Sequence, residues 1–376
     1  MTRLRPSGRG VATGDDRVDA VAKFGFTERQ ARFLVTVMLH SGVCLQRQYA
    51  AFAGIRHGQK TRKFFAKLVK LGFAVEYACR HNRGHLYHVR AKPLYRAIDQ
   101  TDSRHRRPLS AACVVENLGF LDALLSSPSV VWLGTSNDVR VHLSSLAGVS
   151  PEQLDPFLTD DLRSTRAIRG RMATGIDLSG RWVFLYVPTD TRIEGFHTFV
   201  QRHAAVLARL PSWTVRVVFQ PPLGNTDRYV GTFKLAIASV RPEVLKDLQS
   251  YFKQRRAHTL ERAEIYDEEG YYTAREAFRA PRFQVLYQRW SAQGDGVFEP
   301  ISTDAISDAF SRGAGRIETH VLPFSYRHLS PVVDMPQHPS KGAEEGHITP
   351  ARPRPPLTES ITGVESGASS LHNARV

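Results

Sequence analysis

The sequence contains only three cysteines and no long hydrophobic run. Cys44, Cys79 and Cys113 are spaced too widely for a zinc knuckle or a CxxC pair, and a sparse, odd set of this kind suits a reducing cytoplasm. No stretch reaches the roughly 18 consecutive apolar residues of a membrane-spanning helix. The basic N-terminus also lacks the apolar segment of a secretory signal. We therefore expect a cytoplasmic protein that has no contact with a membrane.

Motifs of nucleotide-binding and hydrolytic enzymes are missing as well. The chain contains no GxxxxGK(S/T) phosphate loop, no GxGxxG dinucleotide fingerprint and no GxSxG nucleophile elbow. We therefore expect no bound cofactor, and we predict that the protein is not an enzyme.

Positive charge, in contrast, is abundant and confined to one segment. The formal net charge is +15. Residues 23–107 contain 18 lysines and arginines against four acids, a net of +14, whereas residues 108–376 contain 29 of each. A charge that served solubility would be spread over the surface, so its concentration indicates a polyanionic partner. Duplex DNA is favoured over a membrane surface, because membrane binding usually requires a basic amphipathic helix with large exposed apolar residues.

Composition divides the chain into four regions. Residues 1–22 lack periodicity and are expected to form a disordered basic arm. Residues 331–376 are rich in Pro, Gly, Ser and Glu, and we expect a disordered tail because few large apolar residues are present to offset the ordering entropy. Residues 23–107 and 108–330 are predicted to be two folded domains, joined by a polar, basic linker at residues 102–108.

Three helices are predicted at the start of the basic domain. Thr27 and Gln30 form a capping box before the first helix. The second is expected over residues 45–53, where Gly54 provides its C-terminal stop. The third is expected over residues 58–71.

The third predicted helix has two distinct faces. Its four lysines recur at i, i+3, i+7 and i+10, and its large apolar residues occupy an adjoining face. These residues are Lys60, Lys63, Lys67 and Lys70 on the first face, and Phe64, Phe65, Leu68 and Leu71 on the second. An ordinary solvated face would also carry acids, and this helix has none. We therefore expect the apolar side to pack on the first helix and the lysines to lie along a phosphate backbone.

Two strands are predicted after the helices. Residues 73–80 alternate between apolar and polar with period two, residues 81–84 supply turn chemistry, and residues 86–90 continue as a second strand. Three helices followed by a hairpin with a basic tip is the order of a winged helix-turn-helix domain. In such a domain the third helix enters the major groove of DNA.

Candidate DNA contacts follow from this assignment. Gln59, Arg62 and Lys63 lie on the first turns of the third helix, where side chains reach base edges. Arg83 at the hairpin tip is expected to enter the minor groove. The remaining basic side chains are expected to contact phosphates, which set position and not sequence. The complete predicted set is Arg56, Gln59, Lys60, Arg62, Lys63, Lys67, Lys70, Arg80 and Arg83.

A group of metal-binding residue types lies in the predicted hairpin. Cys79, His81, His85 and His88 fall within ten residues. No standard zinc spacing is matched, and the register of the hairpin would decide which of them meet. We predict no metal site, and the sequence leaves open whether these four residues bind metal.

The second domain is predicted to be α/β. A helix over residues 109–125 would either seal the first domain or pair with a second copy in a homodimer. Strand–helix–strand spacing in the middle of the domain implies a parallel pair of strands. The strands are expected over residues 130–135, 181–187 and 214–220, the intervening helix over residues 196–210, and further helices over 227–262 and parts of 271–330.

Three segments carry a resemblance to a known family: GFTERQARFL, HGQKTRKFFAKLVKLGFA, and GIDLSGRWVFLYV followed by FHTFVQRHAAVLARLPSWTVRVVF. They are similar to the winged-helix proteins of plasmids and mobile elements called the replication-relaxation family, over about residues 24–220. In that family the second domain resembles a restriction-endonuclease-like core. Its active form needs an Asp, then Glu-x-Lys on the next strand, to hold a divalent metal and activate water.

Asp177 stands where the first carboxylate of such a site would be. Residues 182–187, on the following strand, contain neither an acid nor a lysine. The resemblance therefore implies a degenerate core without the nuclease chemistry, and Asp177 fits equally well in a turn before a strand.

The sequence thus predicts sequence-dependent binding of duplex DNA. The protein would act as a transcriptional regulator or as an accessory factor in plasmid or mobile-element replication or transfer. Two alternatives remain open at this point: a metal-dependent nuclease, and an adaptor whose α/β domain docks a relaxase or replication protein.

Overall fold

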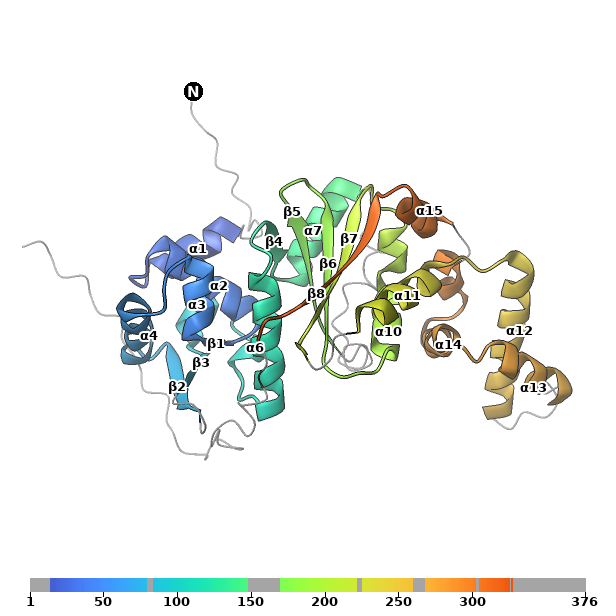
Figure 1. Cartoon of the computed structure of the whole chain (residues 1–376), viewed down its shortest axis with the longest axis horizontal. Helices are drawn as coiled ribbons and strands as arrows, with labels where there is room; N and C mark the ends of the chain where they lie inside the picture. Colours follow the sequence, from blue (N-terminus) through green and yellow to red (C-terminus); the bar gives the residue numbers. More distant parts are fainter. Residues whose placement is uncertain are drawn as a thin grey trace, which may run out of the picture. The chain divides into compact units, whose positions relative to one another are not determined.

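The computed structural model describes residues 14–79, 84–147, 170–221, 225–259, 268–301, 304–324 and 326. This part of the chain is a mixed α+β fold that contains a three-stranded and a five-stranded sheet (Figure 1). Among the helices in these ranges, none is long and apolar enough to cross a membrane.

The N-terminal module, residues 14–106, combines helices with the three-stranded sheet. Its elements are α1 (Gly14–Ala22), α2 (Glu28–His40), β1 (Val43–Leu45), α3 (Gln46–Ala53), α4 (Gln59–Lys70), β2 (Ala74–Ala78), β3 (His85–Val89), α5 (Lys92–Ala97) and the 3-10 turn η1 (Arg104–Arg106). The strands are antiparallel in the order β1-β3-β2.

Local sequence signals predicted most of this module correctly. The capping box is present, with the side chain of Thr27 accepting from the backbone N–H of Gln30 and the Gln30 side chain accepting from that of Thr27. Gly54 ends α3 in the left-handed conformation with φ 63°. The hairpin of β2 and β3 is confirmed. β1 was not predicted, because a strand of three residues is too short to show alternation.

The prediction of a disordered arm over residues 1–22 is wrong from Gly14 onward. Residues 14–22 form α1, whose Val18 and Val21 are buried in the module. Arg17 donates two hydrogen bonds to Asp138, at 2.7 and 2.9 Å. Both groups are buried, and they are 121 residues apart in the sequence. Because α1 is held by contacts with distant residues, its own nine residues show little of the hydrophobic periodicity from which a helix is predicted.

The predicted linker at residues 102–108 is also packed and not simply solvated. His105 is only 7% exposed. Its carbonyl oxygen accepts a hydrogen bond from Nε2 of the buried His88 at 2.8 Å. A Cβ atom on Gly42 would lie 2.6 Å from the same oxygen, so glycine is required there for close approach.

Helix α6 (Ala111–Leu125) seals the N-terminal module, one of the two roles predicted for it. Leu121 packs into the core of the module, and Leu118 packs beside β1 and β3. The same helix turns Phe120 and Leu124 toward the five-stranded sheet, where they pack with Leu185 and its neighbours. One helix therefore contributes to both hydrophobic cores.

The five-stranded sheet has the order β4-β5-β6-β7-β8. Its strands are β4 (Val130–Leu133), β5 (Gly170–Asp177), β6 (Trp182–Pro188), β7 (Trp213–Phe219) and β8 (Gly315–Val321). The pairs β4/β5 and β5/β6 are antiparallel, whereas β6/β7 and β7/β8 are parallel. The predicted parallel pair joined by α10 (Glu194–Leu207) is thus confirmed.

One sequence prediction for this sheet is wrong, and one of its strands was missed. β4 was expected to be buried, but it is an edge strand in which Val131 is 66% exposed. Helices were expected in parts of residues 271–330, and α14 and α15 lie there, but β8 in the same range was not predicted. β8 reads Gly-Arg-Ile-Glu-Thr-His-Val, and its polar residues give little indication of a strand at the edge of a parallel sheet.

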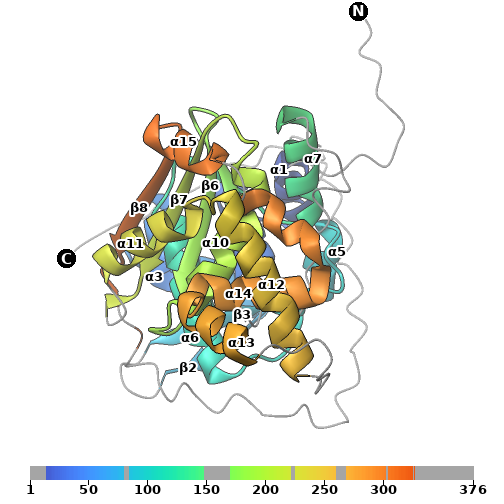
Figure 2. The ribbon, with the colours of Figure 1, turned by 90° about the vertical axis from the view of Figure 1, so that its right-hand side faces the viewer.

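One hydrophobic cluster joins the sheet to four helices, which are α7 (Ser136–Ala147), α10, α11 (Thr226–Ile237) and α15 (Ala305–Ser311). Residues of β6 and β7 that point the other way pack against α6. A further cluster, rich in aromatic residues, is built by α12 (Pro242–Thr259), α13 (Glu268–Ala277), α14 (Pro281–Gln293) and η4 (Asp295–Ile301). Figure 2 shows the ribbons of α12, α13 and α14.

Candidate nucleic-acid interface

An aromatic core fixes the rotation of α4 about its axis. The ring of Phe64 lies 4.4 Å from that of Tyr49 on α3, and the ring of Phe65 lies 4.3 Å from that of Tyr87 on β3. Thr61 and Leu68 are buried on the same side. Because these contacts hold the apolar side against α3 and the sheet, the opposite side of α4 must face solvent.

The outward side of α4 carries most of the predicted DNA-contacting residues. Gln59, Lys60, Arg62, Lys63 and Lys70 are exposed. None of their cationic groups forms an ion pair with a carboxylate in the part of the chain that the structure describes. The helix itself contains no acid. The structure therefore brings these five side chains together on one uncompensated basic face, which we call the α4 face. Arg56 is also exposed, in the turn before α4.

The α4 face has a central row and two flanks. At about 100° per residue, Gln59, Lys63, Ala66 and Lys70 form the outermost row, and Ala66 is exposed between the lysines. Lys60 lies on the flank toward α2, and Arg62 on the opposite flank. Ala66 was not among the predicted contacts, because a small apolar side chain gives no charge signal.

A groove separates α4 from the start of α2. It has a volume of about 980 Å³ and is lined by Lys60, Lys63 and Lys67 on α4, and by Arg29 and Arg32 on α2. The two arginines were not predicted as contacts, and both have partners. Arg29 donates to the carbonyl oxygen of Ala53 at 3.1 Å. Arg32 pairs with Glu28 at 3.0 Å and Asp15 at 3.3 Å, and hydrogen bonding to Glu28 is the main reason its pKa is raised.

Lys67 has an internal role that the sequence did not indicate. Its side chain is half-buried, and its ammonium donates to the carbonyl oxygen of Gly25. The ammonium also lies 5.1 Å from the ring centroid of Phe26. Lys67 therefore attaches α4 to the connection between α1 and α2, and fewer of its hydrogens remain for a phosphate than on Lys63 or Lys70.

A chain of polar contacts links the turn before α4 with the hairpin. Nε2 of His57 lies 3.1 Å from Oε1 of Gln46, whose amide donates to the hydroxyl of Tyr87 at 2.7 Å. The hydroxyl donates to Glu76 at 2.9 Å, and the same carboxylate lies 2.8 Å from Nδ1 of His85. Burial, together with the Glu76 carboxylate, raises the pKa of Tyr87 above its usual range. This chain couples α3 and the turn before α4 to β2 and β3.

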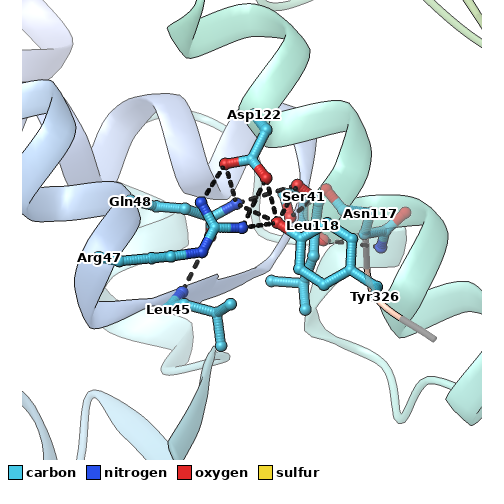
Figure 3. A network of polar contacts seen from close by, with 8 residues as sticks. All are labelled: Ser41, Leu45, Arg47, Gln48, Asn117, Leu118, Asp122 and Tyr326. Carbon is cyan, nitrogen blue, oxygen red and sulfur yellow. Dashed lines mark hydrogen bonds and ion pairs between the residues drawn. The ribbon is translucent and has the colours of Figure 1, made fainter. Parts of the chain in front are cut away.

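Arg47 shows that not every arginine of the basic segment is exposed. Its guanidinium donates to both carboxylate oxygens of Asp122 on α6, at 3.0 and 2.7 Å (Figure 3). The hydroxyl of Tyr326 contacts both groups, and Gln48 donates to Asp122 at 2.9 Å. The ring of Phe324 lies 3.8 Å from the guanidinium carbon. Arg47 therefore holds α3 to α6 and to the segment after β8.

Several predicted residues lie outside the described part of the chain or apart from one another. Arg80, His81 and Arg83 lie outside the residues that the structure describes. In the hairpin register His88 is opposite Val75, four positions from Cys79. Cys79 and His88 are both buried, and His88 donates to a backbone carbonyl. Within the described ranges no three His, Cys, Asp or Glu residues are grouped to hold a metal.

Asp177 completes a turn at the junction of β5 and β6. Its carboxylate accepts from the N–H of Ser179 at 2.8 Å, from the Ser179 hydroxyl at 2.6 Å and from the N–H of Arg181 at 3.0 Å. Burial opposes ionisation, but these hydrogen bonds prevail and lower the pKa of Asp177. Gly180 has φ 79° within the turn. The neighbouring strand β6 is fully buried, and its only polar side-chain groups are the indole N–H of Trp182 and the hydroxyl of Tyr186.

Comparisons with protein-family models, with curated proteins and with solved structures gave no significant match.

Proposed function

We propose that the N-terminal module is a winged helix-turn-helix that binds duplex DNA in a sequence-dependent way. The observation that carries the proposal is the α4 face. Four of its five members are cationic, they lie on a helix without acids, and an aromatic core behind them fixes their direction. A rigid basic helix of this kind suits the major groove, where side chains on its first turns read bases.

The order of elements supports the same assignment. α3 and α4 are two helices joined by a short turn, α2 packs behind them, and β2 and β3 form a hairpin after α4. This is the arrangement expected of a winged helix. In the proposed complex Gln59, Arg62 and Lys63 read base edges, whereas Lys60 and Lys70 contact phosphates.

We further propose that the five-stranded region is not catalytic and that the protein is a regulator or an accessory factor of mobile-element replication or transfer. Two features support the first part of this proposal. Asp177 uses its carboxylate within a turn, and β6 supplies no acid or lysine beside it. A catalytic magnesium usually requires one or two carboxylates directed at the ion, together with substrate phosphates.

The proposal is tested by the salt dependence of DNA binding by the full chain. Fluorescence anisotropy with a random-sequence duplex should give a log affinity that falls linearly with log salt between about 50 and 200 mM. The variant Lys63→Ala/Lys70→Ala should lower the magnitude of this slope by about 1 or more, since the phosphate contact of Lys70 contributes about 0.9.

A matched control removes the same charge with the same spacing elsewhere. Lys246 and Lys253 are exposed on α12 and are also seven residues apart. Lys246→Ala/Lys253→Ala should leave both affinity and slope unchanged. Equal losses in the two double variants would reject the α4 face, and absence of salt-dependent binding by the wild type would reject DNA binding altogether.

A further inference from the structure

The groove between α4 and the start of α2 extends the basic surface beyond the α4 face. Its lining contains five cations and one carboxylate, that of Glu28. The cations are Lys60, Lys63 and Lys67 on α4, and Arg29 and Arg32 on α2. Because Lys60 and Lys63 also belong to the α4 face, the groove and the face form one continuous basic surface.

The aromatic residues that line the groove are engaged in the core of the module. The ring of Tyr49 lies 4.4 Å from that of Phe64, and both residues are buried. The ring of Phe52 lies 5.5 Å from that of the buried Phe33. Stacking of unpaired bases requires aromatic rings with an open face. The groove is therefore suited to a sugar–phosphate backbone and not to unpaired bases.

The position of the groove matches the path of a DNA strand beside an inserted helix. A helix with side chains is about 10–12 Å wide and fills a major groove of about 12 Å, so one backbone runs along each flank of the helix. Lys60 lies on the flank of α4 that is turned toward α2. A backbone on that flank passes between Lys60 and the first turns of α2, where Arg29 and Arg32 are exposed.

Both arginines keep hydrogen-bond donors for such a backbone. The two ion pairs of Arg32, with Glu28 and Asp15, are made by the same nitrogen, Nη2. Arg29 uses Nη1 for the carbonyl oxygen of Ala53. The other N–H groups of these guanidiniums are left for a ligand, and their planar arrangement matches the oxygens of a phosphate.

The ion pairs of Arg32 are held loosely. The side chains of Arg32, Glu28 and Asp15 are 49%, 74% and 83% exposed. Ion pairs that are this exposed contribute little to stability, so Arg32 can turn from the carboxylates to a phosphate at small cost. The same two carboxylates repel a phosphate that enters the groove. They therefore compete with DNA for Arg32 and lower its affinity.

We propose that the groove between α4 and α2 holds the DNA backbone on that flank of α4, that Arg32 is a phosphate contact, and that Glu28 and Asp15 limit DNA affinity by competing for Arg32. This inference rests on the DNA binding proposed above. It adds α2 to the DNA-binding surface and gives that surface a built-in acidic restraint.

Fluorescence anisotropy of the full chain with a random-sequence duplex tests the contact. Arg32→Gln should lower the magnitude of the salt slope by about 0.9 and weaken binding about eightfold at 0.1 M salt, the loss expected for one phosphate contact. Arg96→Gln is the matched control, because Arg96 is exposed on α5 of the same module and does not line the groove. It should bind like the wild type. Thermal melting should show that both variants are folded.

The restraint is tested by removing the acids. Glu28→Gln and Asp15→Asn should each raise DNA affinity about threefold or more, because each removes a charge that repels phosphate and competes for Arg32. Asp102→Asn removes an exposed acid of the same module that does not line the groove, and it should change the affinity less than either.

The outcomes separate this inference from the proposed function. If the wild type binds DNA with a steep salt dependence but Arg32→Gln and Arg96→Gln respond alike, the groove is not a DNA contact, although the α4 face remains one. If Glu28→Gln and Asp15→Asn bind no more tightly than Asp102→Asn, the acidic restraint is rejected. If the wild type shows no salt-dependent binding, the proposed function itself fails.

Discussion

The exposed lysines of α4 and the arginines of the five-stranded region use similar charges in different ways. Lys63 and Lys70 stand in solvent without a carboxylate partner among the described residues. Arg216, in contrast, donates to Glu318 at 2.8 and 3.0 Å and to the Ser127 hydroxyl at 2.7 Å. Arg181 donates to the carbonyl oxygen of Ala314 at 2.7 Å. These arginines of the second region join neighbouring strands, whereas the lysines on α4 are exposed to solvent.

This contrast refines the meaning of the net charge. Residues 108–376 have equal numbers of basic and acidic residues, and several of these charges pair internally. Residues 23–107 have a net charge of +14, but Arg47 and Lys67 are used within the protein. The net charge of +14 therefore overstates the number of cations that the proposed DNA contact could use. Only the fold shows which cations have internal partners and which are exposed.

The largest effect is expected at Arg47, because this cation of the N-terminal module is paired internally, as the arginines of the five-stranded region are. Asp122→Ala would leave a largely buried guanidinium without its carboxylate, and removal of one member of a buried pair costs about 3–5 kcal/mol. Urea unfolding of the full chain measures the loss. Glu276→Ala, which removes the exposed partner of Arg279, should cost less than about 0.5 kcal/mol. Similar losses in both variants would show that Arg47 is not held as the structure indicates.

The next largest effect concerns base reading. Arg62→Ala and Gln59→Ala should each weaken binding to a selected preferred site by about 1–3 kcal/mol and binding to random DNA far less. Lys70→Ala should weaken both to the same extent, because phosphate contacts carry no sequence information. Fragments selected from genomic DNA would supply the preferred site. Equal losses on both kinds of DNA for Arg62→Ala would remove Arg62 from the base-reading set.

A smaller effect separates two lysines of the same helix. Lys67→Ala removes a hydrogen bond to Gly25 and should lower the free energy of unfolding by about 1 kcal/mol. Lys70→Ala removes an exposed side chain and should change it by less than about 0.5 kcal/mol. The order should reverse for DNA, with Lys70→Ala causing the greater loss of salt slope. If Lys67→Ala caused the greater loss of salt slope, the Lys67 ammonium of the wild type would have to leave the Gly25 carbonyl oxygen when DNA binds.

The smallest effect is expected at Asp177. Asp177→Asn should leave DNA affinity unchanged, and neither protein should cleave supercoiled plasmid with magnesium or manganese. Because the pKa of Asp177 is lowered in the folded state, its stabilising effect is present above the ordinary carboxyl pKa and is lost as pH falls through the folded value. The variant should therefore be less stable than the wild type at neutral pH and should approach it in acid. Metal-dependent cleavage that disappears in Asp177→Asn would make the protein a nuclease.

Sequence alone predicted the elements whose signals are local. The capping box of Thr27 and Gln30, the stop at Gly54 and the two faces of α4 each lie within a dozen residues, and each is present in the structure. The exception is Leu71, which was predicted on the apolar face but follows the end of α4 and is 40% exposed. The parallel strands around α10 were predicted for the same reason, since apolar runs marked both.

The features that the sequence did not predict depend on contacts between residues far apart in the chain. α1 is held by Arg17 and Asp138, and Arg47 by Asp122 and Tyr326, across more than 70 residues in each case. Lys67 matched the lysine pattern of α4 and was nevertheless engaged by Gly25, so periodicity identified the helix face but not the availability of each side chain.

The central claim is that α4, and not the second region, contacts DNA. A photoreactive benzoylphenylalanine placed at position 66, in the middle of the α4 face, tests it directly against the same group at position 250 on α12, since both positions are exposed. Irradiation with labelled duplex should give a salt-sensitive crosslink at position 66 that excess unlabelled duplex abolishes, and none at position 250. A crosslink at position 250 that equals or exceeds the one at position 66 would contradict the claim.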